Sequence, residues 1–221
     1  FNVTVNQINA PHTVIKPLAD VTVDEDADTN TINLSNLFSD VDSDTLELSV
    51  ISNNTNLVTA SITNNILTLT YISNANGSTT ITVTATETNT DPQLSAFDTF
   101  SVNVTPINDA PVSISVTSTT LGENNSIGCL VGAINVSDPD LNDTVIFSVN
   151  DPTNTFYKTG NILRCGIKTD YETKNSYDID ITATDSGSLS LTQTFTIRIL
   201  NYIEPPTTIY LSSTSLYENV S

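Results

Sequence analysis

Residues 177–185 read Tyr-Asp-Ile-Asp-Ile-Thr-Ala-Thr-Asp, and residues 81–87 read Ile-Thr-Val-Thr-Ala-Thr-Glu. In both stretches apolar residues alternate with polar ones, which is typical of a β-strand that turns one face to a core and the other to water. The same alternation recurs in residues 46–50, 67–71 and 195–199. Turn-forming Asn, Asp, Gly and Pro separate these stretches, and no helical period of useful length occurs. The sequence therefore predicts an all-β protein.

The two opening stretches belong to a longer internal repeat. Residues 114–126 return 95 positions later as residues 209–221, and residues 1–9 recur as 100–108 and again, in part, as 195–199. A repeat of about 95 to 100 residues that holds about seven strands is the size of one antiparallel two-sheet sandwich. The chain is therefore expected to contain tandem modules of this kind.

The repeat also sets the expected module boundaries. We expect two tandem seven-stranded Greek-key β-sandwiches, one at residues 12–108 and one at residues 109–203. Residues 1–11 are interpreted as the last strand and linker of a preceding module, and residues 204–221 as the linker and first strand of a following one. On this interpretation the chain is a fragment of a longer tandem array.

The charge balance excludes several classes of partner. The 221 residues include 25 Asp and Glu but only 6 Lys and Arg, which gives a formal net charge of −19. Such a chain lacks the basic surface that binds nucleic acid, and an anionic membrane surface would repel it. No apolar stretch approaches the ~18 residues of a membrane-spanning helix. We therefore expect neither a nucleic-acid partner nor direct membrane insertion.

A catalytic role is not expected either. The chain has a single histidine, His12, so no Ser-His-Asp arrangement stands out, and the two cysteines, Cys129 and Cys165, lack a plausible base. A glycosidase needs two carboxylates across a cleft, whereas the acidic runs of this chain repeat at the expected module ends. The sequence predicts a protein that is not an enzyme.

Acidic residues recur at strand ends and beside the proline-containing linkers. The run Ser-Asp-Val-Asp-Ser-Asp-Thr at residues 39–45 matches Ser-Asp-Pro-Asp at residues 137–140. A single Asp in such a place is usually a turn residue, but turns alone do not explain the repetition. Lys and Arg are too few to neutralise these carboxylates, so a bound cation is expected.

Calcium fits the acidic runs best among the common metal ions. It takes about six to eight oxygen ligands and tolerates irregular loops, in which carboxylates, Asn side chains and backbone carbonyls all serve. Magnesium keeps its waters and so fits a protein cage less well. Softer metals prefer His or Cys, and the chain has only one histidine. The expected cofactor is therefore Ca²⁺.

Together these motifs resemble the cadherin repeat in its bacterial or cadherin-like form. In the second module Glu123 is similar to the acidic residue after the family's first strand, and residues 138–140 to its DxD motif. Residues 170–172 resemble the DRE-type motif, and residues 177–185 the YxLxVxAxD motif. The first module lacks a DRE-like motif, with Asn-Ala-Asn-Gly at residues 74–77, and looks more like the dystroglycan-type variant. The chain has no Trp, so adhesion by a swapped N-terminal Trp is not expected.

The resemblance implies where calcium would bind, because the family's sites lie between successive modules. For the junction of the two modules the implied ligands are Glu25, Asn108, Asp109, Asp138, Asp140 and Asp185. For the next junction they are Glu123, Asp170, Glu172, Asn201 and Glu204. At the front of the first module they are Asn9, Asp40, Asp42 and Glu87. Without a DRE-like motif in the first module, the central junction is expected to hold fewer ions than is usual in the family.

The implied function is that of a calcium-rigidified extender or adhesion segment of a large cell-surface or secreted protein, with neighbouring modules as its partners. The alternative is a module that binds another copy, another protein or a carbohydrate, for which Tyr157 and Tyr202 are candidate exposed aromatics. Cys129 and Cys165 fall on strands that neighbour each other in such a sandwich. The sequence is compatible both with a disulfide between Cys129 and Cys165 and with two free thiols.

Overall fold

The computed structural model describes residues 1, 8–88, 92–141 and 143–206. The chain divides into two compact units, Phe1–Asn108 and Asp109–Ser221, and each is described by itself. The strands expected at residues 1–11 and 204–221 lie largely outside the described residues. Within the described part, no helix is long and apolar enough to pass through a lipid bilayer.

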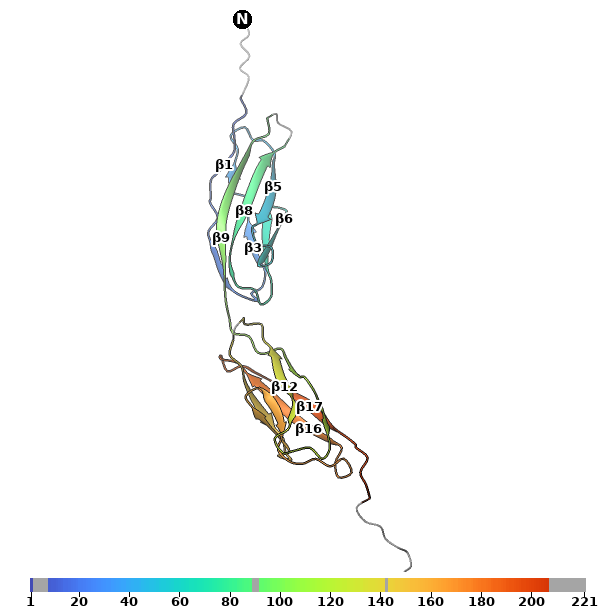
Figure 1. Cartoon of the computed structure of the whole chain (residues 1–221). Coiled ribbons are helices and arrows are strands. Elements are labelled where there is room, and N and C mark those ends of the chain that lie inside the picture. Colours follow the sequence, from blue (N-terminus) through green and yellow to red (C-terminus); the bar gives the residue numbers. More distant parts are fainter. Residues whose placement is uncertain (2–7, 89–91, 142, 207–221) are drawn as a thin grey trace, which may run out of the picture. The chain divides into compact units, whose positions relative to one another are not determined.

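Most strands of the first unit form two main sheets (Figure 1). Its strands are β1 (Thr13–Val14), β2 (Val21–Asp24), β3 (Asn30–Asn33), β4 (Phe38–Ser39), β5 (Leu46–Ser52), β6 (Val58–Thr63), β7 (Ile66–Tyr71), β8 (Gly77–Glu87) and β9 (Ser95–Thr105). One sheet has the order β2-β9-β8-β5 and the other the order β3-β7-β6, while β1 pairs with β4. Strand β2 runs parallel to β9, and every other pair in this unit is antiparallel.

The second unit repeats this plan with four strands in each sheet. Its strands are β10 (Ser113–Val116), β11 (Thr120–Gly122), β12 (Leu130–Ser137), β13 (Ile146–Asn150), β14 (Phe156–Thr159), β15 (Ile162–Cys165), β16 (Ser176–Thr184) and β17 (Ser190–Leu200). The sheet orders are β10-β12-β15-β14 and β11-β17-β16-β13. Strands β10 and β11 are two halves of one first strand, which leaves one sheet and joins the other. With those halves counted together, the described part of this unit has the seven strands of the predicted sandwich.

One apolar core fills each unit, and the predicted alternation produces it. In β8 the side chains of Ile81 and Val83 are fully buried, and in β16 those of Ile179 and Ile181 are at most 1% exposed. The intervening threonines lie on the outer face, where Thr182 Oγ1 lies 2.8 Å from Oγ1 of its cross-strand neighbour on β17. Each core cluster takes residues from both sheets of its unit. The predicted all-β sandwich fold is therefore confirmed for both units.

Candidate metal sites

A loop after β12 gathers three carboxylates at one end of the second unit. Asp138, Asp140 and Asp143 each offer an oxygen, and these atoms lie within 4.8 Å of one another. Asp138 Oδ1 accepts the backbone N–H of Asp140 at 3.0 Å, as in an Asx turn. Asp140 Oδ2 accepts the backbone N–H of Asp109 at 2.7 Å. The other oxygen of Asp138, Oδ2, is buried without a hydrogen-bond partner. A buried anionic oxygen without a donor is unfavourable, so this loop is suited to a cation.

The first unit has the same arrangement in its loop after β4. Asp40 Oδ1 accepts the backbone N–H groups of Asp42 at 2.7 Å and Asp44 at 3.2 Å. Asp42 Oδ2 accepts the N–H of Ala10 at 2.8 Å. Asp40 Oδ2 is buried without a hydrogen-bond partner, like the matching oxygen of the second unit. Desolvation and the charges of nearby carboxylates, chiefly that of Asp40, raise the pKa of Asp44. The negative potential of this loop favours a cation.

Two further predicted ligands close hairpins at the same ends of the units. Glu87 ends β8 and is fully buried, and Asp185 follows β16 and is 5% exposed. Each shares backbone and side-chain hydrogen bonds with a leucine across its hairpin, Leu94 for Glu87 and Leu189 for Asp185. Glu87 forms a group with Asp40, with ligand atoms within 4.8 Å. Among the described residues Asp185 belongs to no such group of three.

The opposite end of the second unit carries a third acidic group. Glu123, Asp170 and Glu172 bring carboxylate oxygens within 4.8 Å of one another. Glu123 is 3% exposed, and its two oxygens accept the backbone N–H groups of Tyr202 at 2.6 Å and Tyr171 at 2.9 Å. These bonds fix Glu123, which follows β11, against the segment that follows β17. The three residues predicted for this end are thus brought together.

Neighbouring side chains orient the exposed members of that group. Asn201 donates from Nδ2 to Glu172 Oε1 at 2.8 Å, and Asn124 donates to the predicted ligand Glu204. A hydrogen bond from the Thr173 hydroxyl holds the pKa of Asp170 below its ordinary value. Asp170 is therefore anionic at neutral pH, as a metal ligand must be.

The same end of the first unit is less acidic. Glu25 is 6% exposed, and its Oε1 accepts the N–H of Ile107 at 2.7 Å. Its Oε2 accepts Nδ2 of Asn76 at 3.3 Å, so a neutral amide lies where the second unit has acidic residues. Asn108 follows at the end of this unit. The expectation that Glu25 and Asn108 share an ion with residues of the second unit stays a prediction.

A left-handed residue follows each of the two buried glutamates. Asp26 has φ 60° and Asn124 has φ 57°, a region that Asp and Asn enter more readily than other non-glycine residues.

Neither Glu25 nor Glu123 has a Lys or Arg within ion-pair distance in the part of the chain that the structure describes. Buried carboxylates of this kind need a compensating positive charge or several hydrogen bonds.

His12, like Asp143, is a residue of these groups that sequence reasoning missed. Its side chain is 2% exposed, and its Nδ1 lies 3.4 Å from Oε1 of Glu87. A nitrogen of its ring, Oδ of Asp40 and Oε of Glu87 form a group within 4.8 Å. The only signal in the sequence is its place directly after Ala10-Pro11, where the second unit has Val112 after Ala110-Pro111.

Solved structures share this architecture. A structure of mouse cadherin-23 EC22-24 has 17% sequence identity and a TM-score of 0.50, and the match covers 87% of this chain and 67% of that one. A structure of PcdhgB3 EC1-4 has 20% sequence identity and a TM-score of 0.56, and the match covers 89% of this chain and 51% of that one. A structure of human protocadherin-24 EC1-2 has 16% sequence identity and a TM-score of 0.51, and the match covers 87% of this chain and all of that one. The fold is that of cadherin domains. No family model matches the chain, and no curated protein matches it in sequence.

The cadherin-like second unit carries both cysteines as free thiols. The N–H of Cys165 donates to the carbonyl of Cys129 at 3.1 Å, so the two residues lie opposite each other on neighbouring chain segments. Cys165 is fully buried, its Sγ donates to the carbonyl of Ile167 at 2.9 Å, and burial raises its pKa. Cys129 is partly exposed. Of the two alternatives, the structure has the free thiols.

We expect iodoacetamide to alkylate Cys129 roughly tenfold faster than Cys165 in the native protein, because the reagent needs an exposed thiolate. Peptide mass spectrometry after timed labelling measures both rates, and labelling in denaturant gives the control in which the two rates converge. Equal native rates would contradict the burial of Cys165. An absence of labelling at both residues even in denaturant would show that they form a disulfide.

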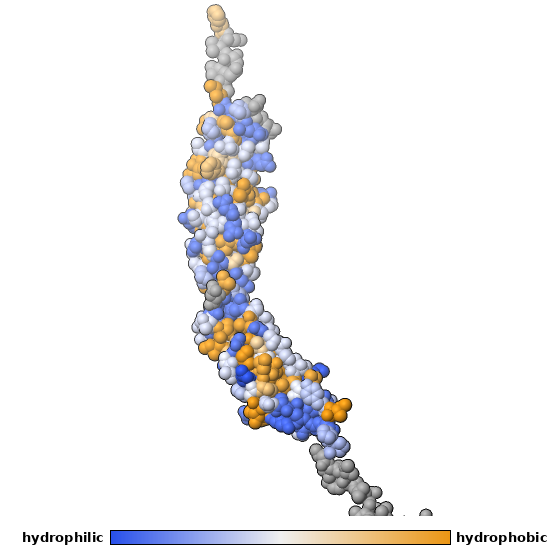
Figure 2. Space-filling view, viewed as in Figure 1, coloured by the Kyte–Doolittle hydropathy of each residue, from blue (hydrophilic) through white to orange (hydrophobic). Residues whose placement is uncertain are grey.

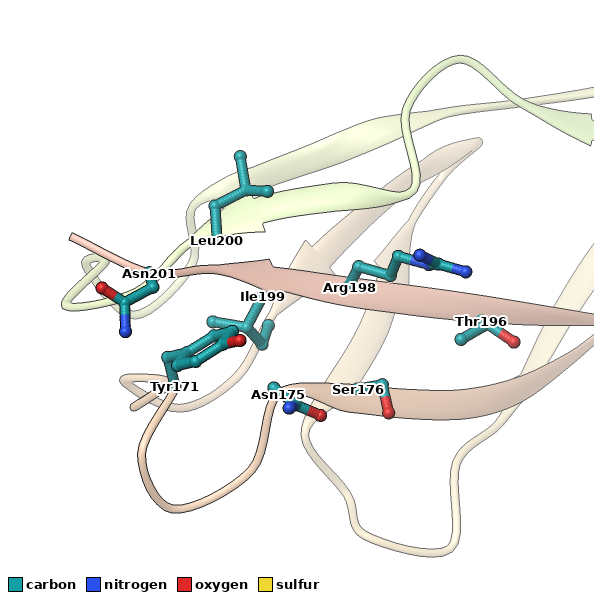
Figure 3. Close-up of a pocket in the computed structure, with 8 residues that line it drawn as sticks. All are labelled: Tyr171, Asn175, Ser176, Thr196, Arg198, Ile199, Leu200 and Asn201. Carbon is teal, nitrogen blue, oxygen red and sulfur yellow. The ribbon is translucent and has the colours of Figure 1, made fainter.

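A polar hollow of about 510 Å³ lies at one end of the second cadherin-like unit (Figure 3). Its lining comes from the loop before β16, the start of β16, the end of β17 and the residue after it: Tyr171, Asn175, Ser176, Thr196, Arg198, Ile199, Leu200 and Asn201. One aromatic ring, one cation and several amide and hydroxyl groups suit a polar ligand. The aromatics considered from the sequence, Tyr157 and Tyr202, are 42% and 58% exposed and do not line it. Figure 2 shows polar and apolar residues mixed over the visible face of each unit.

Proposed function

We propose that the chain is a calcium-binding extender or adhesion segment of a larger cell-surface or secreted protein. One observation carries this proposal. The first aspartates of the matching loops, Asp40 and Asp138, each have a buried oxygen without a hydrogen-bond donor. The same unsatisfied oxygen in two separately folded units is what a repeated cation site requires.

The ligand chemistry of these loops supports Ca²⁺. The group of Asp138, Asp140 and Asp143 consists of carboxylates only, in an irregular loop whose backbone carbonyls can add further ligands. Calcium accepts such a set at flexible distances, whereas Mg²⁺ demands an octahedral arrangement and keeps several waters. The formal net charge of −19 adds a general attraction for divalent cations.

Bound calcium would make the linker between the units stiff. The proposed ligands Glu25 and Asn108 belong to the first unit, and Asp109, Asp138, Asp140 and Asp185 belong to the second. An ion that takes oxygens from both sets restricts the linker that joins them. Without the ion, the carboxylates repel one another and the linker gains freedom. A stiff array of this kind holds a binding region away from a cell surface, and we propose an extracellular location on these grounds.

A second candidate function is recognition of a carbohydrate or of another copy of the chain. The observation that favours a carbohydrate is the polar hollow, whose lining combines Tyr171 with amide and hydroxyl side chains (Figure 3). We rank it second because sugar sites usually present exposed aromatic platforms, and Tyr171 is partly buried. A glycan array that shows no binding would count against it.

Thermal unfolding with and without calcium tests the leading proposal. We expect 1 mM Ca²⁺ to raise Tm by roughly 10 °C over chelator, because an ion at about a hundred times its Kd stabilises the folded state by about 2.7 kcal/mol. The same concentration of Mg²⁺ is the control and should have a much smaller effect. An unchanged Tm, or equal effects of the two ions, would overturn the calcium role.

A further inference from the structure

We propose that His12, Asp40 and Glu87 form a second type of metal site, which binds Zn²⁺ or a similar transition-metal ion in preference to Ca²⁺. All three residues belong to the first unit, and their ligand atoms lie within 4.8 Å of one another. Calcium prefers oxygen ligands alone, whereas an imidazole nitrogen suits Zn²⁺. An imidazole within this group therefore disagrees with a purely calcium-binding role for this end of the unit.

The spacing of the first two ligands suits a small tetrahedral ion. His12 Nδ1 and Glu87 Oε1 are 3.4 Å apart. Zinc binds imidazole nitrogen and carboxylate oxygen at about 2.0–2.2 Å, and two ligands at a tetrahedral angle are then separated by about 3.4 Å. The separation of these two atoms thus matches that of two ligands of a shared zinc ion.

The ring orientation of His12 supports the same conclusion. Its Nε2 lies 2.8 Å from the carbonyl oxygen of Ala85, and a carbonyl can only accept a hydrogen bond. The N–H of Ala96, opposite Ala85 in the ladder, also points at Nε2, at 3.1 Å. Both contacts are made by Nε2, so Nδ1 is the ring nitrogen that faces Glu87 Oε1. Histidine ligands of metals commonly donate their other N–H to a backbone carbonyl in this way.

The surroundings hold the three ligands and keep water out. His12 is 2% exposed and Glu87 is fully buried. Asn9 donates from Nδ2 to Glu87 Oε2 at 2.7 Å, and the ring of Phe38 packs edge-on against the imidazole, with centroids 5.8 Å apart. Asp40 adds the buried oxygen that has no hydrogen-bond partner. A cation between these groups would satisfy that oxygen.

The second unit provides a natural comparison. Val112 replaces His12 there, so its group of Asp138, Asp140 and Asp143 contains oxygen ligands only. The metal-binding groups of the two units thus differ in one type of ligand atom, the imidazole nitrogen of the first unit. We expect nitrogen-dependent zinc binding at the first unit alone.

The test uses tag-free chain, in which His12 is the only histidine. Zn²⁺ is titrated in the presence of 1 mM Ca²⁺ by calorimetry, and the single imidazole is followed by ¹⁵N NMR. We expect one saturable Zn²⁺ per chain and a shift of the His12 Nδ1 signal that follows occupancy. His12→Val, which installs the residue of the second unit, should weaken this binding at least about tenfold, and Glu87→Gln should do the same.

Other outcomes would overturn the proposal. Zn²⁺ binding that neither variant weakens would place the metal elsewhere, and an imidazole signal unchanged by Zn²⁺ would show a closed His12–Glu87 contact that binds no metal. Melting curves of both variants confirm that they fold. A calcium-induced rise in Tm that persists in His12→Val separates this proposal from the calcium role, since the second unit keeps its own group.

Discussion

Replacing Asp138 and Asp140 together by asparagine will weaken calcium binding by the second unit by about a hundredfold or more, because two of its anionic ligands become neutral. Asp138 carries the buried oxygen without a donor, and Asp140 holds the backbone of Asp109. Asparagine keeps the shape of both side chains and one acceptor oxygen in each. Isothermal titration with Ca²⁺, under conditions where the wild type saturates, measures the loss.

A matched control separates coordination from overall charge. Asp178→Asn with Asp180→Asn makes the same charge change on β16, where the two aspartates accept hydrogen bonds from the hydroxyls of Thr196 at 2.6 Å and Thr194 at 2.7 Å. This double variant should bind calcium with nearly wild-type affinity. If both double variants weakened binding equally, calcium would be held by the diffuse negative charge of the chain, and the assignment of a site to the loop after β12 would be wrong.

The fold could be predicted from the sequence because its signal is local. Alternation in residues 81–87 and 177–185 depends only on neighbouring positions, and both stretches form inner strands with buried apolar faces. The repeat then supplied the number of sandwiches. Which strands pair with each other was harder to predict from the sequence, because strands as short as β1 and β4 leave almost no periodic pattern.

The acidic groups could be predicted where their members are close in sequence or where a family motif marks each of them, as for Glu123, Asp170 and Glu172. Asp138 and Asp140 were found as a repeated pair, and the structure adds Asp143 to them. His12 was not found, because 75 residues separate it from Glu87 and no repeat unit carries a second histidine. Its role depends on a long-range contact that composition cannot reveal.

The sequence showed that the first unit lacks one acidic motif of the second, but it did not show which residue contacts Glu25 instead. The stretch at residues 74–77 lacks the acidic motif, and the structure shows that Asn76 takes its place as the partner of Glu25. An amide offers a neutral donor in addition to an oxygen. We expect this end to bind calcium more weakly than the end that holds Glu123, which has two acidic neighbours.

Replacing Asp151 by alanine will destabilise the second unit strongly, by about 2–3 kcal/mol in the free energy of unfolding or roughly 10 to 20 °C in Tm. Asp151 is 8% exposed and organises the loop between β13 and β14. Its oxygens accept the backbone N–H groups of Thr153 at 2.8 Å, Thr155 at 2.6 Å and Phe156 at 2.7 Å. Alanine leaves these donors, two of them buried, without an acceptor.

The charge of Asp151 gives this prediction a pH dependence. Burial on its own raises the pKa of Asp151, but the hydrogen bonds from Thr153, Phe156 and Thr155 outweigh it and hold the pKa below the ordinary value of 3.8. A carboxyl whose pKa is lower in the folded than in the unfolded state stabilises the fold fully above the unfolded value. That stabilisation is lost as the pH falls below 3.8 through the folded pKa.

Urea unfolding of wild type, Asp151→Asn and Asp151→Ala over a pH series measures this effect. Asparagine keeps the size of the side chain, so the difference between wild type and Asp151→Asn reports the charge and should shrink as the pH falls below 3.8. Titration of the other carboxylates acts on both proteins alike and cancels in the difference. Asp178→Ala, which removes an exposed strand aspartate with a single hydroxyl partner, should change stability by less than about 0.5 kcal/mol. A difference that stays constant with pH would mean that the loop is held by the shape of Asp151 alone, and that its charge contributes nothing to the fold.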